Sequence, residues 1–71
     1  MPDNYKQRMC IEYRQLTERI TKLELILCKA KTDKLDFKLS CPIELLERQL
    51  TVMKEYREIL IERATIEEVN L

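Results

Sequence analysis

The sequence contains no glycine and no histidine, and its two prolines, Pro2 and Pro42, stand outside every periodic apolar run. Without glycine, a glycine-rich phosphate-binding loop is excluded, and sheets joined by tight turns are disfavoured. Without histidine, the catalytic pairs in which histidine serves as the base are excluded. A chain of 71 residues with this composition favours a single small domain built from long helices.

Paired cysteines are lacking as well. Cys10, Cys28 and Cys41 are an odd number of isolated thiols, and no Cys-x-x-Cys motif occurs. Zinc sites need clustered ligands, so we expect no metal and no cofactor. We also predict that the protein is not an enzyme, because no nucleophile stands in a motif with a base. Neighbouring carboxylates such as Glu67 and Glu68 are expected on solvated faces.

Neither sign of charge predominates, because 13 basic and 13 acidic residues balance. This balance argues against general binding of DNA or RNA, which needs a basic excess. The two halves of the chain nevertheless differ: residues 1–40 hold nine basic and six acidic residues, whereas residues 41–71 hold four and seven. An antiparallel hairpin would set these halves side by side and neutralise much of the difference.

Long apolar runs are also missing, and none approaches the roughly 20 residues of a membrane span. The N-terminal residues are polar, and no apolar stretch typical of a signal peptide follows them. We therefore expect a cytoplasmic protein whose thiols stay reduced and pack as small hydrophobic side chains.

What the sequence does contain is a seven-residue rhythm of apolar residues. Between about residues 4 and 31 they recur at alternating steps of four and three, which predicts an amphipathic helix. The members of this row are Met9, Tyr13, Leu16, Ile20, Leu23, Leu27 and Ala30.

A second helix is predicted from about residue 42 to residue 67, with the same steps broken only at Arg57. Its apolar row is Ile43, Leu46, Leu50, Met53, Leu60 and Ala64, flanked by Leu45, Val52 and Ile59. Pro42 has the fixed φ that suits a first helical position, so Ser40 or Cys41 is expected to be the cap.

Residues 32–40 connect the two helices. Leu35, Phe37 and Leu39 alternate with polar residues, which is the period-two pattern of an extended segment. We expect this segment to cross the open end of the hairpin with Phe37 as a plug, and the alternative is a strand pairing between two chains. Residues 1–71 thus form one domain, an all-α antiparallel two-helix hairpin.

The apolar faces of both helices are wider than one partner helix can cover. We therefore predict that two hairpins associate into a four-helix bundle, or into a higher even oligomer. The residues expected at the interface between chains are Met9, Tyr13, Leu16, Ile20, Leu46, Leu50, Met53 and Leu60.

Tyrosine and arginine residues gather toward the end of the hairpin where the first helix begins. Aromatic rings can stack on a base while guanidinium groups hold phosphate. The predicted ligand-binding residues are Tyr5, Arg8, Tyr56, Arg57 and Arg63. The alternative is that the tyrosines are interface aromatic residues and the arginines are solvated ion pairs. Arg57 takes an apolar position, so it either pairs across an interface or meets an anionic ligand.

A resemblance to known proteins rests mainly on the pattern Arg48-Gln49-Leu50-x-x-Met53-x-x-Tyr56-x-x-Ile59-Leu60-x-x-Arg63. This pattern resembles a family of small helical-hairpin proteins of phages and prophages, including crAss-like phages of the gut. The similarity extends over nearly the whole chain, and Tyr5, Arg8 and Glu12 carry it at the beginning. The spacer before the second helix is longer here than in the commoner pattern.

The resemblance implies a non-virion phage accessory protein that acts against host defences in the cytoplasm of an infected bacterium. By analogy with other helical-hairpin proteins of phages, it implies sequestration of a cyclic or linear nucleotide signal without catalysis. One alternative is an inhibitor or adaptor directed at a protein, such as an anti-CRISPR or a regulator of a host enzyme. The other is a purely structural oligomeric bundle.

Overall fold

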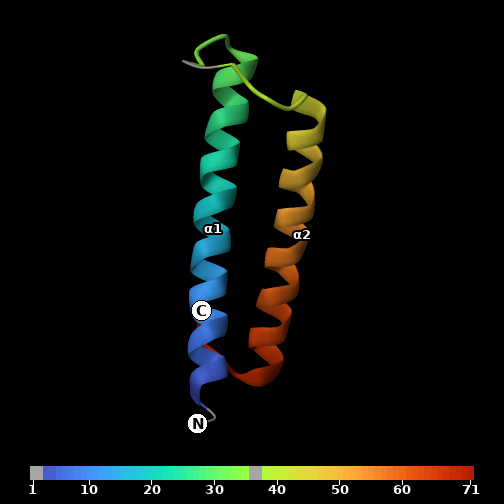
Figure 1. Cartoon of the computed structure of the whole chain (residues 1–71). Coiled ribbons are helices and arrows are strands. Elements are labelled where there is room, and N and C mark those ends of the chain that lie inside the picture. Colours follow the sequence, from blue (N-terminus) through green and yellow to red (C-terminus); the bar gives the residue numbers. More distant parts are fainter. Residues whose placement is uncertain (1–2, 36–37) are drawn as a thin grey trace.

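A computed structural model of the protein describes residues 3–35 and 38–71. Helix α1 spans Asp3–Lys31 and helix α2 spans Ile43–Glu67. The helices run antiparallel and side by side, so that both ends of the chain lie at one end of the pair and the connector lies at the other (Figure 1). The predicted all-α two-helix hairpin is confirmed, and the described residues contain no strand.

The core is a short row of apolar side chains between the two helices. Ile20 and Leu60 are its most enclosed members, with 1% and 0% of their surface exposed. The buried residues are Met9, Leu16, Ile20, Leu27, Leu60 and Ala64. They come from the predicted rows with steps of three and four, because those positions face the other helix when two helices pack lengthwise.

The eight residues predicted at an interface between chains all lie on this seam within one chain. Four of them, Met9, Leu16, Ile20 and Leu60, are already buried by the other helix of the same hairpin. The other four, Tyr13, Leu46, Leu50 and Met53, are half-buried. The half-buried residues keep surface that a second copy could contact, and the interface between chains stays a prediction.

Two ion pairs join α1 to α2 along the seam. Lys31 Nζ lies 2.6 Å from Glu47 Oε2, and Lys54 Nζ lies 2.9 Å from Glu24 Oε2. Both pairs are solvent-exposed and therefore weak contributors to stability. Each helix places its two charged partners seven residues apart, so both pairs form in the same register of the helices.

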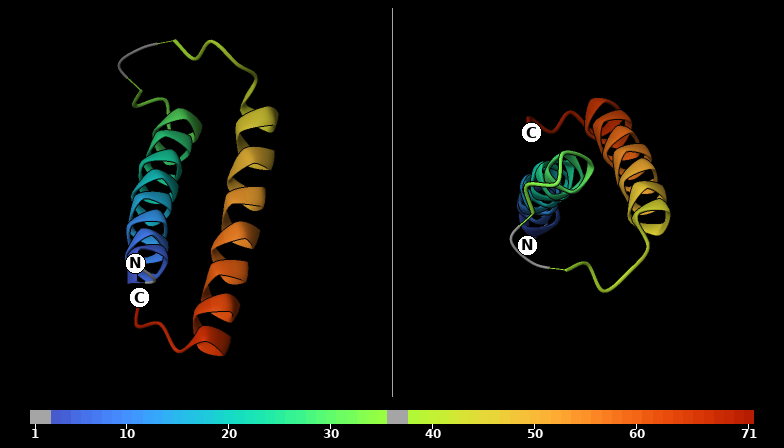
Figure 2. Two further views of the ribbon diagram at one scale, coloured as in Figure 1. Left: turned by 60° about the horizontal axis from the view of Figure 1, so that its bottom comes forward. Right: turned by 90° about the horizontal axis from the view of Figure 1, so that it is seen from above.

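The helices end in left-handed residues, although neither is a glycine. Asp33 follows α1 and Glu68 follows α2, each with a φ of 58°. After α2, the Val69 N–H donates to the Ala64 carbonyl over 2.8 Å. A left-handed residue with a Cβ costs about 1 kcal/mol relative to glycine. At Glu68 this turn sends residues 69–71 back across α1 (Figure 2).

The start of α2 differs by one residue from the prediction. Pro42 has a ψ of 144°, which is extended, so it caps the helix and Ile43 is the first helical residue. The Pro42 carbonyl accepts hydrogen bonds from the N–H groups of Leu45 and Leu46, and no side chain caps the helix. The fixed φ of proline suits both positions, and only ψ distinguishes them.

The connector is only partly described. Residues 34–35 and 38–39 have no regular secondary structure, and Leu35 and Leu39 are half-buried. Phe37, the predicted plug, lies outside the described residues, so its role stays a prediction.

Candidate functional site

The beginning of α1 meets the end of α2 through a tyrosine, a glutamate and an arginine. The Tyr5 hydroxyl donates a hydrogen bond to Glu67 Oε1. Arg63 Nε lies 3.8 Å from Glu67 Oε2, one helical turn earlier on α2. The structure therefore brings two of the predicted ligand residues, Tyr5 and Arg63, to a shared carboxylate.

Glu67 was missed as a site residue because it was expected on a solvated face. It is half-buried, and it contacts the Tyr5 hydroxyl of α1 and the Arg63 side chain of its own helix. A signal was present in the sequence: Arg63 and Glu67 are four residues apart, the spacing of ion pairs along a helix. That pair makes this end of the hairpin less positive than the arginines alone suggest.

The hydrogen bond to Glu67 raises the pKa of Tyr5, and desolvation and the negative charge of Glu67 raise it further. The positive charge of Arg63 opposes this shift. A raised pKa means that the folded state favours the protonated hydroxyl. The stability gained from this bond is therefore complete below pH 10 and is lost as the pH rises through the pKa of the folded state.

We expect Tyr5→Phe to flatten the loss of stability that the parent shows at alkaline pH. Thermal unfolding would be followed by circular dichroism between pH 8 and pH 11.5. The pKa of Lys31 is raised by its bond to Glu47, so loss of the Lys31 proton also lowers the stability of both proteins in this pH range. The measured quantity is therefore the difference in stability between the variant and the parent at each pH. Tyr13→Phe is the control, because it leaves the bond to Glu67 in place. Equal pH dependence in Tyr5→Phe and the parent would contradict the assignment.

The folded-back tail creates a small pocket beside α1. Its lining residues are Cys10, Tyr13, Arg14, Thr17, Glu18, Asn70 and Leu71, and its volume is about 270 Å³. The Cys10 thiol donates to the Asn70 carbonyl over 3.3 Å, which holds the tail against α1. The Thr17 Oγ1 atom is buried and has no hydrogen-bond partner among the described residues. The pocket thus combines an aromatic ring and a guanidinium group with one unused hydroxyl group.

A second hollow lies on the α2 side of the same tail. It has a volume of about 320 Å³, and it shares Tyr13, Asn70 and Leu71 with the first pocket. Ala64 and Thr65 of α2 also line it. Tyr13 therefore lies where both hollows meet.

Arg57 lies nearer the middle of α2, on the seam face between Met53 and Leu60. It is half-buried, and no ion pair or hydrogen bond of its guanidinium group is present within residues 3–35 and 38–71. Arg63 lies six residues further along α2, a rise of about 9 Å along a helix. Tyr56, beside Arg57, is exposed.

The five predicted ligand residues therefore do not line one hollow. Tyr5 and Arg63 meet at Glu67, and Arg8 is exposed one turn after Tyr5. Tyr56 and Arg57 lie two to three turns from that end. A ligand that touches all five would have to extend along the hairpin.

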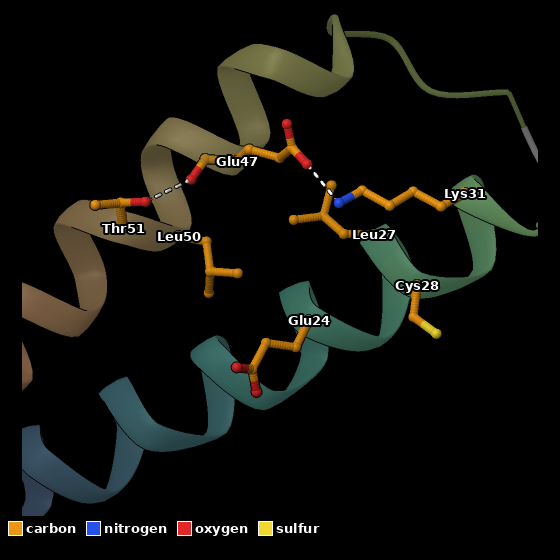
Figure 3. A pocket seen from close by; sticks show the side chains of 7 residues that line it. All are labelled: Glu24, Leu27, Cys28, Lys31, Glu47, Leu50 and Thr51. Atoms are coloured by element: carbon orange, nitrogen blue, oxygen red, sulfur yellow. Dashed lines mark hydrogen bonds and ion pairs between the residues drawn. The ribbon is translucent and has the colours of Figure 1, made fainter.

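A larger hollow lies at the opposite end, between the helices and near the connector. Its volume is about 510 Å³, and Lys31 reaches across it to Glu47 above Leu27 and Leu50 (Figure 3). Cys28 also lines it, with its sulfur directed away from α2 (Figure 3). Arginine and aromatic side chains are not among its lining residues, and its lysine is already paired. It is therefore a weaker candidate for an anionic ligand than the tail end.

Metal-binding clusters and membrane-spanning helices are both absent from the described residues. In residues 3–35 and 38–71, cysteine, aspartate and glutamate side chains do not gather in groups of three that could hold a metal ion. Neither helix is long and apolar enough to cross a membrane, for the part of the chain that the structure describes.

Comparison with known proteins gives one match. The sequence model of a protein family described as Sequestin matches residues 3–66. No curated protein and no solved structure matches the chain. The matched region contains Tyr5, Arg57 and Arg63 together with nearly all of both helices, whereas Glu67 and the folded-back tail lie beyond it.

Proposed function

Because the chain belongs to the Sequestin family, we propose that it acts without catalysis, by binding a partner molecule and sequestering it. The partner that its site suits best is a cyclic or linear nucleotide that carries an immune signal. The protein would then be a phage accessory protein that removes this signal in the cytoplasm of an infected bacterium. The family name supports sequestration, and the arginine and tyrosine residues described above support the choice of ligand.

Arg57 is the observation that carries the proposal. A guanidinium group at a half-buried seam position costs free energy unless an anion accompanies it. No carboxylate of the described residues accompanies Arg57. Phosphate oxygens match the planar fork of arginine donors, so a phosphate group would complete this position.

The tail end of the hairpin supports recognition of the base. The rings of Tyr5 and Tyr13 offer surfaces on which a base can stack, and Arg8 and Arg14 lie exposed beside them. The pocket of about 270 Å³ is slightly below the usual range for small-molecule sites, which begins near 300 Å³. It would hold one part of a nucleotide, with the phosphates reaching along the helices toward Arg57.

A test is native mass spectrometry of protein purified from cells that contain the signal, followed by denaturation. We expect an additional mass of a few hundred daltons that denaturation releases as an unaltered nucleotide. The refolded protein should then bind that nucleotide in a calorimetric titration. Bare chains, together with no heat from a panel of cyclic and linear nucleotides, would contradict the proposal. Release of a cleaved product would contradict its non-catalytic part.

A second candidate is an inhibitor or adaptor directed at a host protein. The large apolar side chains that α2 leaves exposed favour it, because such side chains often mark protein interfaces. Recovery of one host protein in equal amounts with the chain, and no bound nucleotide, would favour this candidate.

A further inference from the structure

Helix α2 carries a second apolar row that the hairpin leaves uncovered. Its members are Leu45, Val52, Ile59 and Ile66, which are 46%, 57%, 54% and 81% exposed. Each follows the last by seven residues, so the row runs as one stripe along the helix. We call this set the outer row. It lies beside the seam row that packs on α1, and it does not take part in the buried core.

The elongated hairpin exposes more surface than a compact monomer of its mass, which is enough for a partner to cover. The accessible surface is 5718 Å², whereas a compact monomer of 8.6 kDa exposes about 4,700 Å². The radius of gyration is 15.2 Å, against about 11 Å for a compact domain of this length. The excess surface, about 1,000 Å², is close to the roughly 800 Å² that each partner buries in a stable interface.

We propose that the outer row is covered by the outer row of a second copy, with the two α2 helices antiparallel. The midpoint of the row lies between Glu55 and Tyr56. Antiparallel packing about that point sets Leu45 near Ile66 of the second copy, and Val52 near its Ile59. An open hollow of about 410 Å³ between Leu45 and Val52 would receive the isoleucine side chains of the second copy.

The charges beside the outer row are complementary in this direction. Arg48 and Glu62 are exposed, lie on the same flank of the row, and have no ion pair within the described residues. In the antiparallel arrangement, Arg48 of each copy lies opposite Glu62 of the other, which gives two complementary pairs. A parallel arrangement would bring opposite flanks together instead, so Arg48 would lie beside Gln49 of the other copy and would not meet Glu62.

The outer row is thus complementary to itself in spacing and in charge, which is the property of an interface with two-fold symmetry. Glu55 lies near the proposed axis, opposite its own copy, and this like-charge contact weakens the pair slightly. The inference depends on the surface of α2 alone and holds whether or not a nucleotide is the ligand.

A charge exchange tests the pairing. Sedimentation equilibrium would measure the dimer constant of the parent and of its variants. We expect Arg48→Glu and Glu62→Arg each to weaken the dimer about tenfold, because two attractive pairs become repulsive. The double variant should recover the parent value. Arg19→Glu, an exposed change on α1, is the matched control. A monomeric parent at hundreds of micromolar, or no recovery in the double variant, would overturn the proposal.

A cross-link tests the direction without changing the charges of the pair. In a background where Cys10, Cys28 and Cys41 are serine, Glu55→Cys should form a disulfide between copies under oxidation. Leu45→Cys should not, because antiparallel helices carry the two copies of residue 45 far apart. Cross-linking of Leu45→Cys as readily as Glu55→Cys would show a parallel pair, and cross-linking of neither would show that another face is buried.

Discussion

Replacing Leu60 by alanine should remove most of the cooperative unfolding transition of this protein. Leu60 has no exposed surface and packs with Leu16 and Ile20 in the only buried cluster that the described residues form. A leucine-to-alanine change at such a site costs about 2–5 kcal/mol. A chain of this size holds only a few kcal/mol of net stability, so the loss is comparable with the whole.

Urea unfolding followed by circular dichroism at 222 nm would measure this loss. Leu25→Ala is the matched control, since Leu25 is on α1 and 54% exposed, and its removal should change the unfolding free energy by no more than about 0.5 kcal/mol. An unchanged midpoint in Leu60→Ala would mean that the seam between α1 and α2 does not hold the fold. The protein concentration must be equal throughout, because association with a second copy would also stabilise the hairpin.

Replacing Arg57 by methionine should make the hairpin more stable and the ligand weaker. Methionine fills a similar volume on the seam without a charge, so the unfolding free energy should rise by about 1 kcal/mol. Loss of charge-assisted hydrogen bonds to a phosphate should cost about 1.5–3 kcal/mol of binding, which is roughly a 10- to 150-fold weaker affinity. The two changes have opposite signs, which separates a functional arginine from a structural one.

The measurements are urea unfolding without ligand and calorimetric titration with the nucleotide that the purified protein carries. Arg19→Met removes an exposed arginine from α1 and should change neither quantity appreciably. If Arg57→Met lowers stability, then Arg57 is a structural residue of the seam. If affinity is unchanged, the anion is bound elsewhere, and the exposed Arg8 and Arg14 become the next residues to test.

The sequence was sufficient to predict the hairpin because the seam is a repeated, local pattern. Steps of three and four place Leu16, Ile20 and Leu60 on the inner faces for any antiparallel pair of helices. The same spacing does not distinguish apolar residues that pack within one chain from those that would pack against a second chain. Of the residues predicted at an oligomer interface, Met9, Leu16, Ile20 and Leu60 are buried by their own hairpin, and the interface itself stays a prediction.

The ends of α2 were harder to predict because they depend on single backbone angles. Pro42 suits two neighbouring positions, and the extended ψ that makes it a cap has no signature in the sequence. Glu68 is an unusual residue for a left-handed turn, a position that commonly falls to glycine. The tail pocket depends on that turn, so its Cys10, Thr17 and Asn70 were not identified from residue types.

The positions of the candidate ligand residues in the hairpin could be predicted only in part from the sequence. That Tyr5 and Arg63 lie at one end follows from antiparallel helices, and the hydrogen bond and ion pair at Glu67 agree with it. The rise of the helix places Arg57 about 9 Å from Arg63 along α2. Tyr56 and Arg57 therefore lie apart from the end of the hairpin where Tyr5 contacts Glu67. The sequence predicts the helices and their direction, but the distance between these residues follows from helical rise and must be added to it.

The position of both termini at one end of the hairpin has a mechanical consequence (Figure 1). A force applied between the ends of the chain pulls the helices apart like a zipper, and it loads the contacts one after another. The contacts at this end, between Cys10 and Asn70 and between Tyr5 and Glu67, open first. The cluster around Leu60 follows, and the pair of Lys31 and Glu47 beside the connector opens last. The hairpin should therefore yield at low force in small steps, whereas pulling on opposite ends of the two helices would shear the whole seam at once.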